Sequence, residues 1–286
     1  MPDTGPGQGQ AILNLNAYNP SEIQEAIEKV GVTKADMPFL PCFMLGVVAG
    51  GSIGLGALYY TIVASDAQLS FAVGRVLGGF VFSLGLTLVL VCGAELFTGN
   101  NLIVMAWASG RVSLVRMLRN WVVVYFGNLV GALGLVALVV LSRHLEMNNG
   151  RIAQTVIEIA AAKIKPDFVT LFFKGVLCNV LVCMAVWIAF AGRSVTDKIV
   201  GLIFPISAFV AAGFEHCIAN LYFLPLAWLT IQAGGAMPEI DVSGVTIAGI
   251  VHNLMAVTLG NVVGGAGLVG VVYWVIYRKG LAARSK

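Results

Sequence analysis

The sequence predicts an all-α membrane protein in which six spanning helices form an inverted repeat of three plus three. Of its 286 residues, 58% are hydrophobic and only 11% are charged, and the mean hydropathy is +0.90. Soluble domains are about a quarter charged, so a chain this apolar belongs in a bilayer. The third and sixth apolar segments carry similar stretches, YFGNLVGALGLV (125–136) and TLGNVVGGAGLVG (258–270). With three spans in each half, the second half enters the membrane from the opposite face, an arrangement that often surrounds a site near the membrane midplane.

The N-terminal 36 residues predict a polar segment outside the membrane. Residues 1–18 have the Gly-rich, polar composition of a disordered stretch, without the basic and apolar regions of a signal peptide. The sequence Asn-Pro-Ser-Glu at 19–22 is typical of a helix start. Four apolar residues then share one helix face: Ile23, Ala26, Ile27 and Val30. We interpret this segment either as an amphipathic helix on the membrane surface or as an ordinary surface helix.

Six apolar segments are each long enough to cross a bilayer, since about 20 residues span its hydrocarbon core. We expect the spans at about 39–63, 73–105, 121–141, 168–191, 200–231 and 246–277. The second and fifth are too long for one straight crossing, and charges interrupt them at Glu95 and at Glu215-His216. Irregular backbone at membrane depth is tolerated only where protein or a water-filled cavity satisfies it. We therefore expect both helices to be broken at these charges.

The distribution of Lys and Arg predicts that both termini are cytoplasmic, because cytoplasmic loops carry an excess of these residues. With that orientation the internal segments hold eleven Lys and Arg residues and the external loops hold four. The chain then divides into a cytoplasmic N-terminal segment with the amphipathic helix (1–36), a six-helix channel domain (37–277) and a basic cytoplasmic tail (278–286).

His216 is the strongest candidate for chemistry. Ionisable residues inside a membrane are rare and usually line a polar path, so we favour a pore position over an ordinary core position. Histidine titrates close to neutral pH. A nearby anion stabilises the imidazolium form, so an anion in the pore would favour protonation of His216 or take a proton from it.

Three polar residues at the breaks accompany this histidine. Glu215 adjoins His216, and Glu95 has the matching place in the first half. Two carboxylates lining a pore would repel an anion, so we expect each to accept backbone N–H groups or to pair with polar groups of a neighbouring segment. Thr98 follows the first break, where its hydroxyl can donate to an anion or to His216, or can cap a helix.

Other candidates lie within the spans. Asn128 and Asn261 stand between small residues that let helices approach closely, where a buried Asn bonds across the gap; Asn261 also reaches toward the site. Lys174 either extends to the interface or attracts anions into the outer mouth. Four apolar residues are candidates for pore constrictions, although spacing alone favours ordinary packing: Phe82, Leu86, Leu96 and Phe209.

Several other functions lack the residues that they need. The chain has three histidines, no His-Glu-x-x-His motif and no phosphate-binding Gly-rich loop, so we expect no metal and no cofactor. A membrane-embedded enzyme or redox subunit is the alternative from another class, but the sequence supplies too few ligands for it. A scaffold or receptor without flux is a third possibility. The five cysteines are interpreted as buried small hydrophobes, and the net charge of +3 does not indicate a nucleic-acid partner.

Seven motifs together resemble the formate/nitrite transporter family over residues 20 to 280. They are FSLGL (82–86), CGAELFTGN (92–100), YFGNLVGAL (125–133), KGVLCNVLVCMAVW (174–187), GRS (192–194), GFEHCIAN (213–220) and VTLGN (257–261). The resemblance implies an aquaporin-like protomer of six helices, a homopentamer with one pore per subunit, and a bacterial or archaeal cytoplasmic membrane.

The resemblance also implies roles for individual residues. His216 matches the family's central pore histidine, with Thr98 and Asn261 as its hydrogen-bonding neighbours. Phe82, Leu86, Leu96 and Phe209 match its apolar constrictions. Lys174 and Asn179 match positions on the fourth helix, and Lys163 resembles a loop lysine of formate channels.

The expected function is therefore transport of a small monovalent anion through a membrane channel. The motifs favour formate over nitrite, and hydrosulfide, acetate and lactate are further alternatives. Because a charged anion cannot cross apolar constrictions cheaply, we expect it to accept a proton near His216 and to cross as the neutral acid.

Overall fold

The structure is a computed structural model that describes residues 17–235 and 239–279. The first half of the chain forms, in order, α1 (Pro20–Ala35), α2 (Phe39–Ala64), α3 (Phe71–Phe82), α4 (Leu84–Cys92), α5 (Phe97–Asn100), η1 (Asn101–Ile103), α6 (Val104–Ala108) and α7 (Leu114–Leu141). The second half forms η2 (His144–Glu146), α8 (Arg151–Ile164), α9 (Phe168–Ala191), α10 (Val195–Ala212), α11 (Cys217–Gln232), α12 (Ile247–Val262), η3 (Val263–Val271), α13 (Val272–Trp274) and η4 (Val275–Lys279). Every element in the described ranges is helical, which confirms the all-α prediction. The stretch predicted to be disordered and the basic tail lie almost wholly outside these ranges.

Within the described residues, six helices are long and apolar enough to cross a membrane: 39–64, 71–92, 114–141, 168–191, 195–212 and 247–277. Both expected breaks are present. The chain leaves α4 at Gly93 and resumes as α5 at residue 97, and it leaves α10 at Gly213 and resumes as α11 at residue 217. Gly93 and Gly213 have φ values of 80° and 74°, the left-handed region that glycine adopts at low cost.

Each half contains one closely packed pair of helices. α2 packs on α7 in the first half, and α9 packs on α12 in the second. Glycines make these approaches possible, because a Cβ added to Gly131 of α7 would overlap the carbonyl oxygen of Val47, and one added to Gly260 of α12 would overlap that of Phe172. The expectation that small residues allow close helix packing is confirmed. The opposite orientation of the two halves in a membrane stays a prediction.

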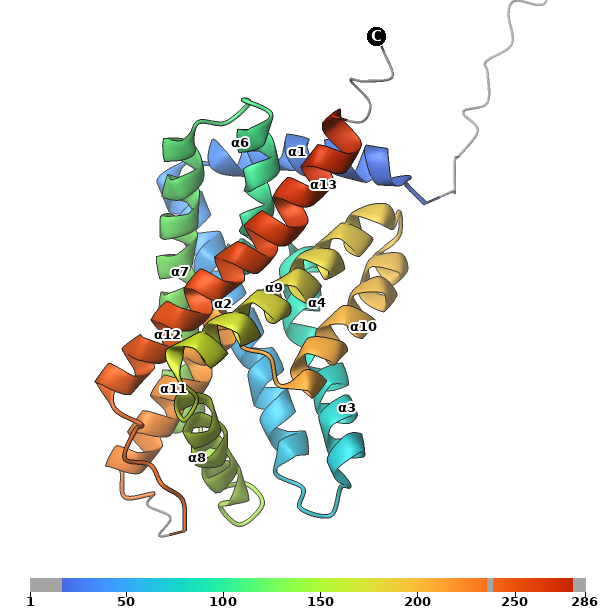
Figure 1. Cartoon of the computed structure of the whole chain (residues 1–286). Coiled ribbons are helices and arrows are strands. Elements are labelled where there is room, and N and C mark those ends of the chain that lie inside the picture. The colour runs from blue at the N-terminus through green and yellow to red at the C-terminus, as the bar shows by residue number, and fades with distance from the viewer. Residues whose placement is uncertain (1–16, 236–238, 280–286) are drawn as a thin grey trace, which may run out of the picture.

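Two amphipathic helices, α1 and α8, lie at opposite ends of the molecule (Figure 1). α1 starts at a capping box in which Asn19 and Glu22 bond each other's backbone. Its apolar residues Ile23 and Ile27 are buried, and it contacts η1 and α6. The apolar face of α1 thus packs on the protein itself, as expected for an ordinary surface helix. α8 contacts α11 at the other end.

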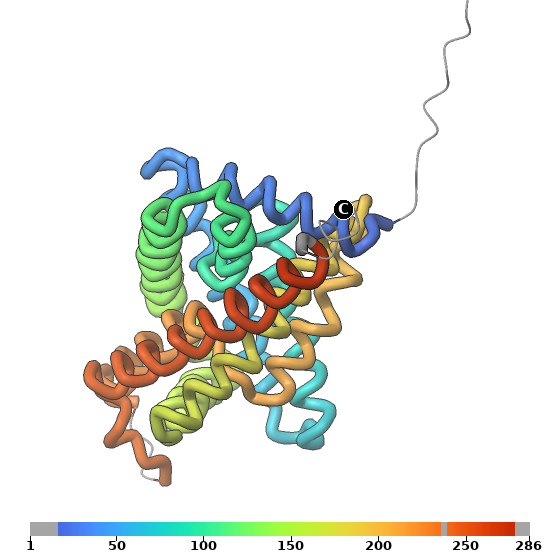
Figure 2. The backbone as a smooth tube through the Cα atoms, turned by 45° about the horizontal axis from the view of Figure 1, so that its top comes forward, coloured from blue at the N-terminus to red at the C-terminus, as the bar shows by residue number. Residues whose placement is uncertain are grey.

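The last helix runs obliquely along one side of the molecule, from α12 through α13 (Figures 1 and 2). Residues 263–271 and 275–279 in this helix have π-helical hydrogen bonding. The Trp274 indole N–H donates to the Ser109 hydroxyl over 2.7 Å and fixes this end of the helix to the segment after α6. α1 and α13 lie at the same end of the molecule, as an even number of crossings requires.

One sequence-based expectation was wrong, and one helix is longer than the span expected within it. Cys42, Cys178, Cys183 and Cys217 are buried, but Cys92 is exposed at the end of α4. An apolar window does not reveal which face a residue occupies, which is why the sequence misplaced this thiol. The helix that contains the third expected span starts earlier, at Leu114, because Arg116 pairs with Asp36 and Arg119 donates to the Met37 carbonyl, so charges are accommodated in the first turns of α7.

Candidate functional site

Thr98 and His216 meet where the two broken helices face each other. The Thr98 hydroxyl lies 3.0 Å from His216 Nε2, although 118 residues separate them in the chain. Both side chains are almost completely buried, at 0% and 2% exposure. Thr98 is in α5, directly after the first break, and His216 is the N-cap of α11, directly after the second. Thr98 does not cap α5, since that position belongs to Leu96.

The hydrogen bonds fix the tautomer of His216. Nδ1 accepts the backbone N–H of Ala219 over 3.1 Å, which is the cap of α11. A neutral imidazole has one acceptor and one donor nitrogen, so its proton is on Nε2 and is donated to the Thr98 oxygen. The hydroxyl proton of Thr98 is then left for another acceptor. The pair therefore presents one O–H donor at the centre of the molecule.

Aromatic rings stack beside this pair. The ring of Phe209 lies over the imidazole of His216, with centroids 5.9 Å apart and an angle of 23° between the planes. Phe82 meets Phe209 edge to face at 5.7 Å. Both phenylalanines are at most 4% exposed. An apolar layer therefore covers His216 on one side.

Two cavities lie beside the two breaks, and His216 lines one of them. The α1-side cavity measures about 210 Å³ and is lined by residues that include Ile27, Lys34, Leu86, Glu95 and Leu96. The α8-side cavity measures about 350 Å³ and is lined by residues that include Phe82, Lys163, Phe209, Glu215 and His216. No residue lines both cavities. The four candidate constriction residues are thus divided, with two leucines on one cavity and two phenylalanines on the other.

Asn128 and Asn261 stabilise the two helix breaks by equivalent hydrogen bonds. Asn128 accepts from the Phe97 N–H at 3.0 Å and donates to the carbonyl oxygens of Gly46 and Glu95. Asn261 accepts from the Cys217 N–H at 2.9 Å and donates to the carbonyl oxygens of Gly175 and Glu215. Asn261 therefore bonds the backbone on both sides of His216 and not its ring. These contacts satisfy backbone groups that the breaks leave without helical partners.

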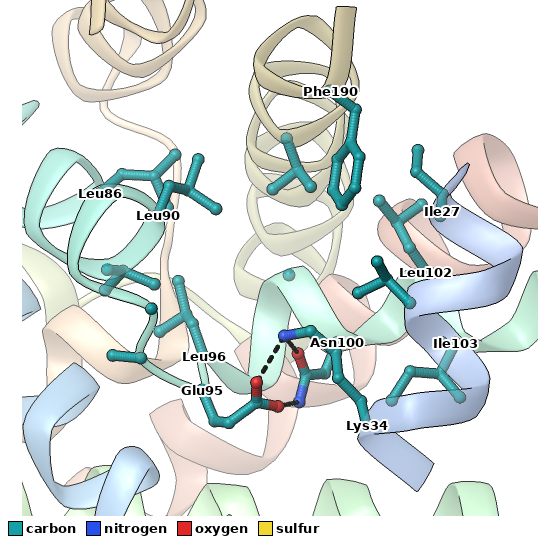
Figure 3. Close-up of a pocket in the computed structure, with 17 residues that line it drawn as sticks. Ile27, Lys34, Leu86, Leu90, Glu95, Leu96, Asn100, Leu102, Ile103 and Phe190 are labelled. Atoms are coloured by element: carbon teal, nitrogen blue, oxygen red, sulfur yellow. Dashed lines mark hydrogen bonds and ion pairs between the residues drawn. The ribbon is translucent and has the colours of Figure 1, made fainter. Parts of the chain in front are cut away.

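Each glutamate pairs with a lysine from an amphipathic helix. In the α1-side cavity, Lys34 of α1 lies 2.7 Å from Glu95, and both bond Asn100 (Figure 3). In the α8-side cavity, Lys163 of α8 lies 3.0 Å from Glu215, to which Asn220 also donates over 2.7 Å. Pairing compensates the cost of burying these carboxylates. Each glutamate thus pairs with polar groups of neighbouring segments, one of the two arrangements expected for it, and each also lines a cavity.

A second asparagine completes each of these groups. Asn100 donates to Asn120, whose own amide donates to the Lys34 carbonyl. Asn220 donates to Asn253 in the same way, and Asn253 donates to the Lys163 carbonyl. We call the two sets the α1-side tetrad (Lys34, Glu95, Asn100, Asn120) and the α8-side tetrad (Lys163, Glu215, Asn220, Asn253).

Two candidates from the fourth span have different surroundings. Asn179 is fully buried, and its amide donates to the Asn101 side chain and to the Asn261 carbonyl at 2.8 and 2.7 Å. It connects the segment after the first break to α12. Lys174 lines the α8-side cavity, and its carbonyl accepts the Glu215 N–H. Its ammonium group has no partner among the described contacts.

Sequence reasoning missed several members of the site. It did not select Lys34 or the tetrad asparagines, yet a repeat in the spacing could have found them. An Asn follows Glu95 and Glu215 by five residues. Another Asn precedes Asn128 and Asn261 by eight residues. It also missed Arg75, which lines the α8-side cavity and donates to the Val210 and Ala211 carbonyls at the C-terminal end of α10. A cation there complements the helix dipole.

Comparison with known proteins gives consistent matches. The family model described as formate/nitrite transporter matches residues 21–275. The formate channel FocA of Escherichia coli (strain K12) is 40% identical over 271 residues, which cover 90% of this chain and 94% of that protein. FocA of Haemophilus influenzae is also 40% identical, covering 91% and 94%. A probable formate transporter of Methanothermobacter thermautotrophicus is 34% identical, covering 91% and 97%.

Two solved structures are also similar to this chain. A pentameric formate channel with formate bound has a TM-score of 0.76 at 41% identity, covering 84% of this chain and 98% of that one. An ion channel described as belonging to the FNT family has a TM-score of 0.78 at 29% identity, covering 89% and 98%.

Proposed function

Because this chain belongs to the formate/nitrite transporter family, we propose that it forms a membrane pore for a small monovalent anion and that this anion is formate. The observation that carries the proposal is the buried Thr98–His216 pair between the two breaks, where His216 lines one cavity and Gly99, the residue after Thr98, lines the other. The relatives named as formate channels support the choice of anion. Nitrite is the second candidate, since Lys174 adds a cation in FFKGVLCN, a stretch that also resembles nitrite members.

The path runs from one cavity to the other past the four apolar side chains. Lys174 supplies positive charge in the α8-side cavity, whereas Lys34 and Lys163 are each paired with a glutamate. Leu86 and Leu96 narrow it on the α1 side, and Phe82 and Phe209 narrow it on the α8 side. Crossing such an apolar layer as an anion is costly. Two proton donors, the Thr98 hydroxyl and His216, therefore lower the barrier to passage of the anion. Asn261, Asn179 and Glu215 position these donors through the backbone.

The proton step follows from the bonds of His216. A second proton can be placed only on Nδ1, which now accepts the Ala219 N–H. The imidazolium therefore forms at the expense of this cap and is favoured when an anion beside Nε2 compensates its charge. The anion then takes the Nε2 proton, passes the apolar layer as the neutral acid, and releases the proton beyond it. Proton and anion cross together. His216 is left neutral with its proton on Nδ1, and it regains the resting tautomer when solvent protonates Nε2 and takes the proton from Nδ1, which restores the bond from the Ala219 N–H.

The assembly and orientation complete the proposal. The protein is a homopentamer in a cytoplasmic membrane, with α1 and both termini on the cytoplasmic side; a solved pentameric relative supports the oligomer. Apolar side chains exposed on the spans, such as Phe126, Leu138 and Phe204, face lipid or neighbouring subunits. The chain divides into the N-terminal segment 1–36, the channel 37–277 and the tail 278–286. Nucleic acid and cofactors have no part in this function.

Flux in proteoliposomes tests the proposal. Purified protein is supplied with formate, nitrite or hydrosulfide at two pH values, and protein-free vesicles serve as the control. The expected result is formate flux that exceeds the other two and grows as the pH falls. Equal or greater nitrite flux would move the assignment to nitrite. Absence of flux for all three anions would refute transport.

A further inference from the structure

The α8-side cavity has an unbalanced positive charge that the α1-side cavity lacks. The charged residues of the α1-side cavity are Lys34 and Glu95, which pair with each other. Those of the α8-side cavity are three cations, Arg75, Lys163 and Lys174, and two carboxylates, Glu158 and Glu215. The asymmetry is therefore one net positive charge before pairing is considered.

Once ion pairs are considered, two cations of this cavity, Arg75 and Lys174, have no recorded carboxylate partner, and they differ in their hydrogen bonds. Lys163 pairs with Glu215 at 3.0 Å, and Glu158 pairs with Arg151 at 2.9 Å. Arg75 donates to two carbonyl oxygens of α10 and to the Tyr60 hydroxyl, so its donors face polar partners. Among the described residues, Lys174 is the cation of this cavity for which the structure records neither an ion pair nor a side-chain hydrogen bond. Its charge is available to a ligand in the cavity.

The internal repeat explains why the other cavity has no equivalent. The Leu45 carbonyl accepts the Glu95 N–H over 3.2 Å, and the Lys174 carbonyl accepts the Glu215 N–H over 3.3 Å. Leu45 and Lys174 thus hold equivalent positions in the two halves. An apolar residue is sufficient for the fold at this position, so the lysine is not required by the architecture.

A second observation points to a ligand in the same cavity. Thr155 of α8 lines it and is 2% exposed, and its hydroxyl oxygen has no hydrogen-bond partner among the described residues. Buried hydroxyl groups without a partner are rare in folded proteins. A small oxyanion bound in this cavity would accept a hydrogen bond from this hydroxyl after a rotation of the side chain.

From these observations, we propose that Lys174 and Thr155 form a capture subsite for the transported oxyanion in the α8-side cavity, separate from the Thr98–His216 pair. The subsite rests on the proposed transport function and adds a sidedness to it. At zero voltage, passive transport must have the same permeability in both directions at low concentration. The signature of the subsite is therefore a lower half-saturating concentration on the α8 side than on the α1 side.

The test measures half-saturating concentrations of radiolabelled formate from each side. Proteoliposomes are sorted into one orientation with an affinity tag at the C-terminus. Lys174→Leu, which copies the residue of the other half, is expected to raise the value on the α8 side about tenfold, since a unit charge a few ångströms away contributes on this order. The α1-side value stays within about twofold of the wild type. High salt weakens formate capture on the α8 side in the wild type and has less effect in the variant.

Three further variants separate capture from structural effects. Lys174→Arg keeps the charge and is expected to keep the wild-type value. Thr155→Val is expected to raise the α8-side value about threefold without loss of thermal stability, because replacing an unpartnered hydroxyl costs little. Lys165→Leu removes an exposed lysine that does not line the cavity and is expected to change neither side.

The two proposals fail in different ways. If the wild type carries formate and Lys174→Leu leaves the α8-side value unchanged, or raises both sides equally, the subsite is refuted and the transport function stands. If the wild type carries no small anion, both are refuted.

Discussion

His216 occupies in the second half the position that Leu96 occupies in the first. Asn128 bonds the Glu95 carbonyl and the Phe97 N–H on either side of Leu96, and Asn261 bonds the Glu215 carbonyl and the Cys217 N–H on either side of His216. The repeat therefore builds the same backbone turn twice and places an apolar side chain in one turn and a proton carrier in the other. The asymmetry at the centre of the molecule lies in the side chains and not in the fold.

Asn128 and Asn261 are expected to contribute equally to the stability of the fold. Replacing Asn128 or Asn261 by Leu removes three buried hydrogen bonds and leaves one carbonyl group and one N–H group of the break unsatisfied. At about 1–3 kcal/mol per unsatisfied group, each variant loses roughly 2 kcal/mol or more of stability. Thermal unfolding in detergent measures this loss. Tolerance of one substitution but not the other would contradict the equivalence of the two halves.

The pair of Lys163 and Glu215 is expected to behave as a buried ion pair. Lys163→Met leaves a carboxylate with 5% side-chain exposure unpaired and is expected to cost about 3–5 kcal/mol. The double variant Lys163→Met/Glu215→Gln removes both charges and recovers part of the loss. Arg143→Met breaks an exposed pair with Glu146 and serves as the control, with an expected cost below about 1 kcal/mol. A double variant less stable than the single one would refute this account.

Close packing of α7 on α2 is expected to depend on one glycine and not on its neighbour. Gly131→Ala places a methyl group on the Val47 carbonyl oxygen and forces the helices apart, with an expected cost of about 3 kcal/mol or more. Gly134 lies one turn later with no atom within 4 Å of its added Cβ. Gly134→Ala is therefore expected to be neutral, or stabilising by up to about 1 kcal/mol through helix propensity. Equal loss of folded protein in both variants would contradict the packing argument.

Acid is expected to weaken the packing of η2 against α8. His144 lies in η2, outside the spans, and burial lowers its pKa from the usual 6.5. Its Nε2 is buried without a partner, and the nearby Glu146 is paired with Arg143. The unfolded state binds the proton more readily, so this histidine makes stability fall as the pH drops from 6.5 toward the lowered pKa.

His144→Leu tests this pH effect. The stability of the wild type falls below pH 6.5, and in the variant this fall is expected to be smaller by the contribution of His144. Amide hydrogen exchange in α8, measured at two pH values, reports the loosening directly. Identical pH profiles of exchange in the variant and the wild type would show that His144 is not responsible.

Hydropathy and charge were sufficient to predict the spans and the two breaks. A long apolar run with a charge at its middle has few solutions in a bilayer, so Glu95 and Glu215 located both breaks. Thr98 and His216 were accessible to the same reasoning, because each directly follows a break. The sequence could not show which atoms they join, since the 3.0 Å contact links residues 118 positions apart.

The lysine partners were harder to predict. Lys34 and Lys163 reach the glutamates from helices that precede the spans, over 61 and 52 residues, and no local periodicity encodes such a pairing. Arg75 resembles an ordinary residue at the start of a span until the C-terminal carbonyls of α10 are placed beside it. Tertiary packing supplied these contacts, and the internal repeat was the signal in the sequence that could have suggested the tetrads.

The most direct test of the central claim is the pH dependence of formate flux in His216→Asn. Asparagine is a good N-cap, so its side chain can replace Nδ1 as the acceptor for the Ala219 N–H and preserve α11, but it cannot carry a proton at neutral pH. The expected result is a stable channel whose formate flux no longer increases as the pH falls. A variant that keeps the wild-type pH dependence would show that His216 does not transfer the proton.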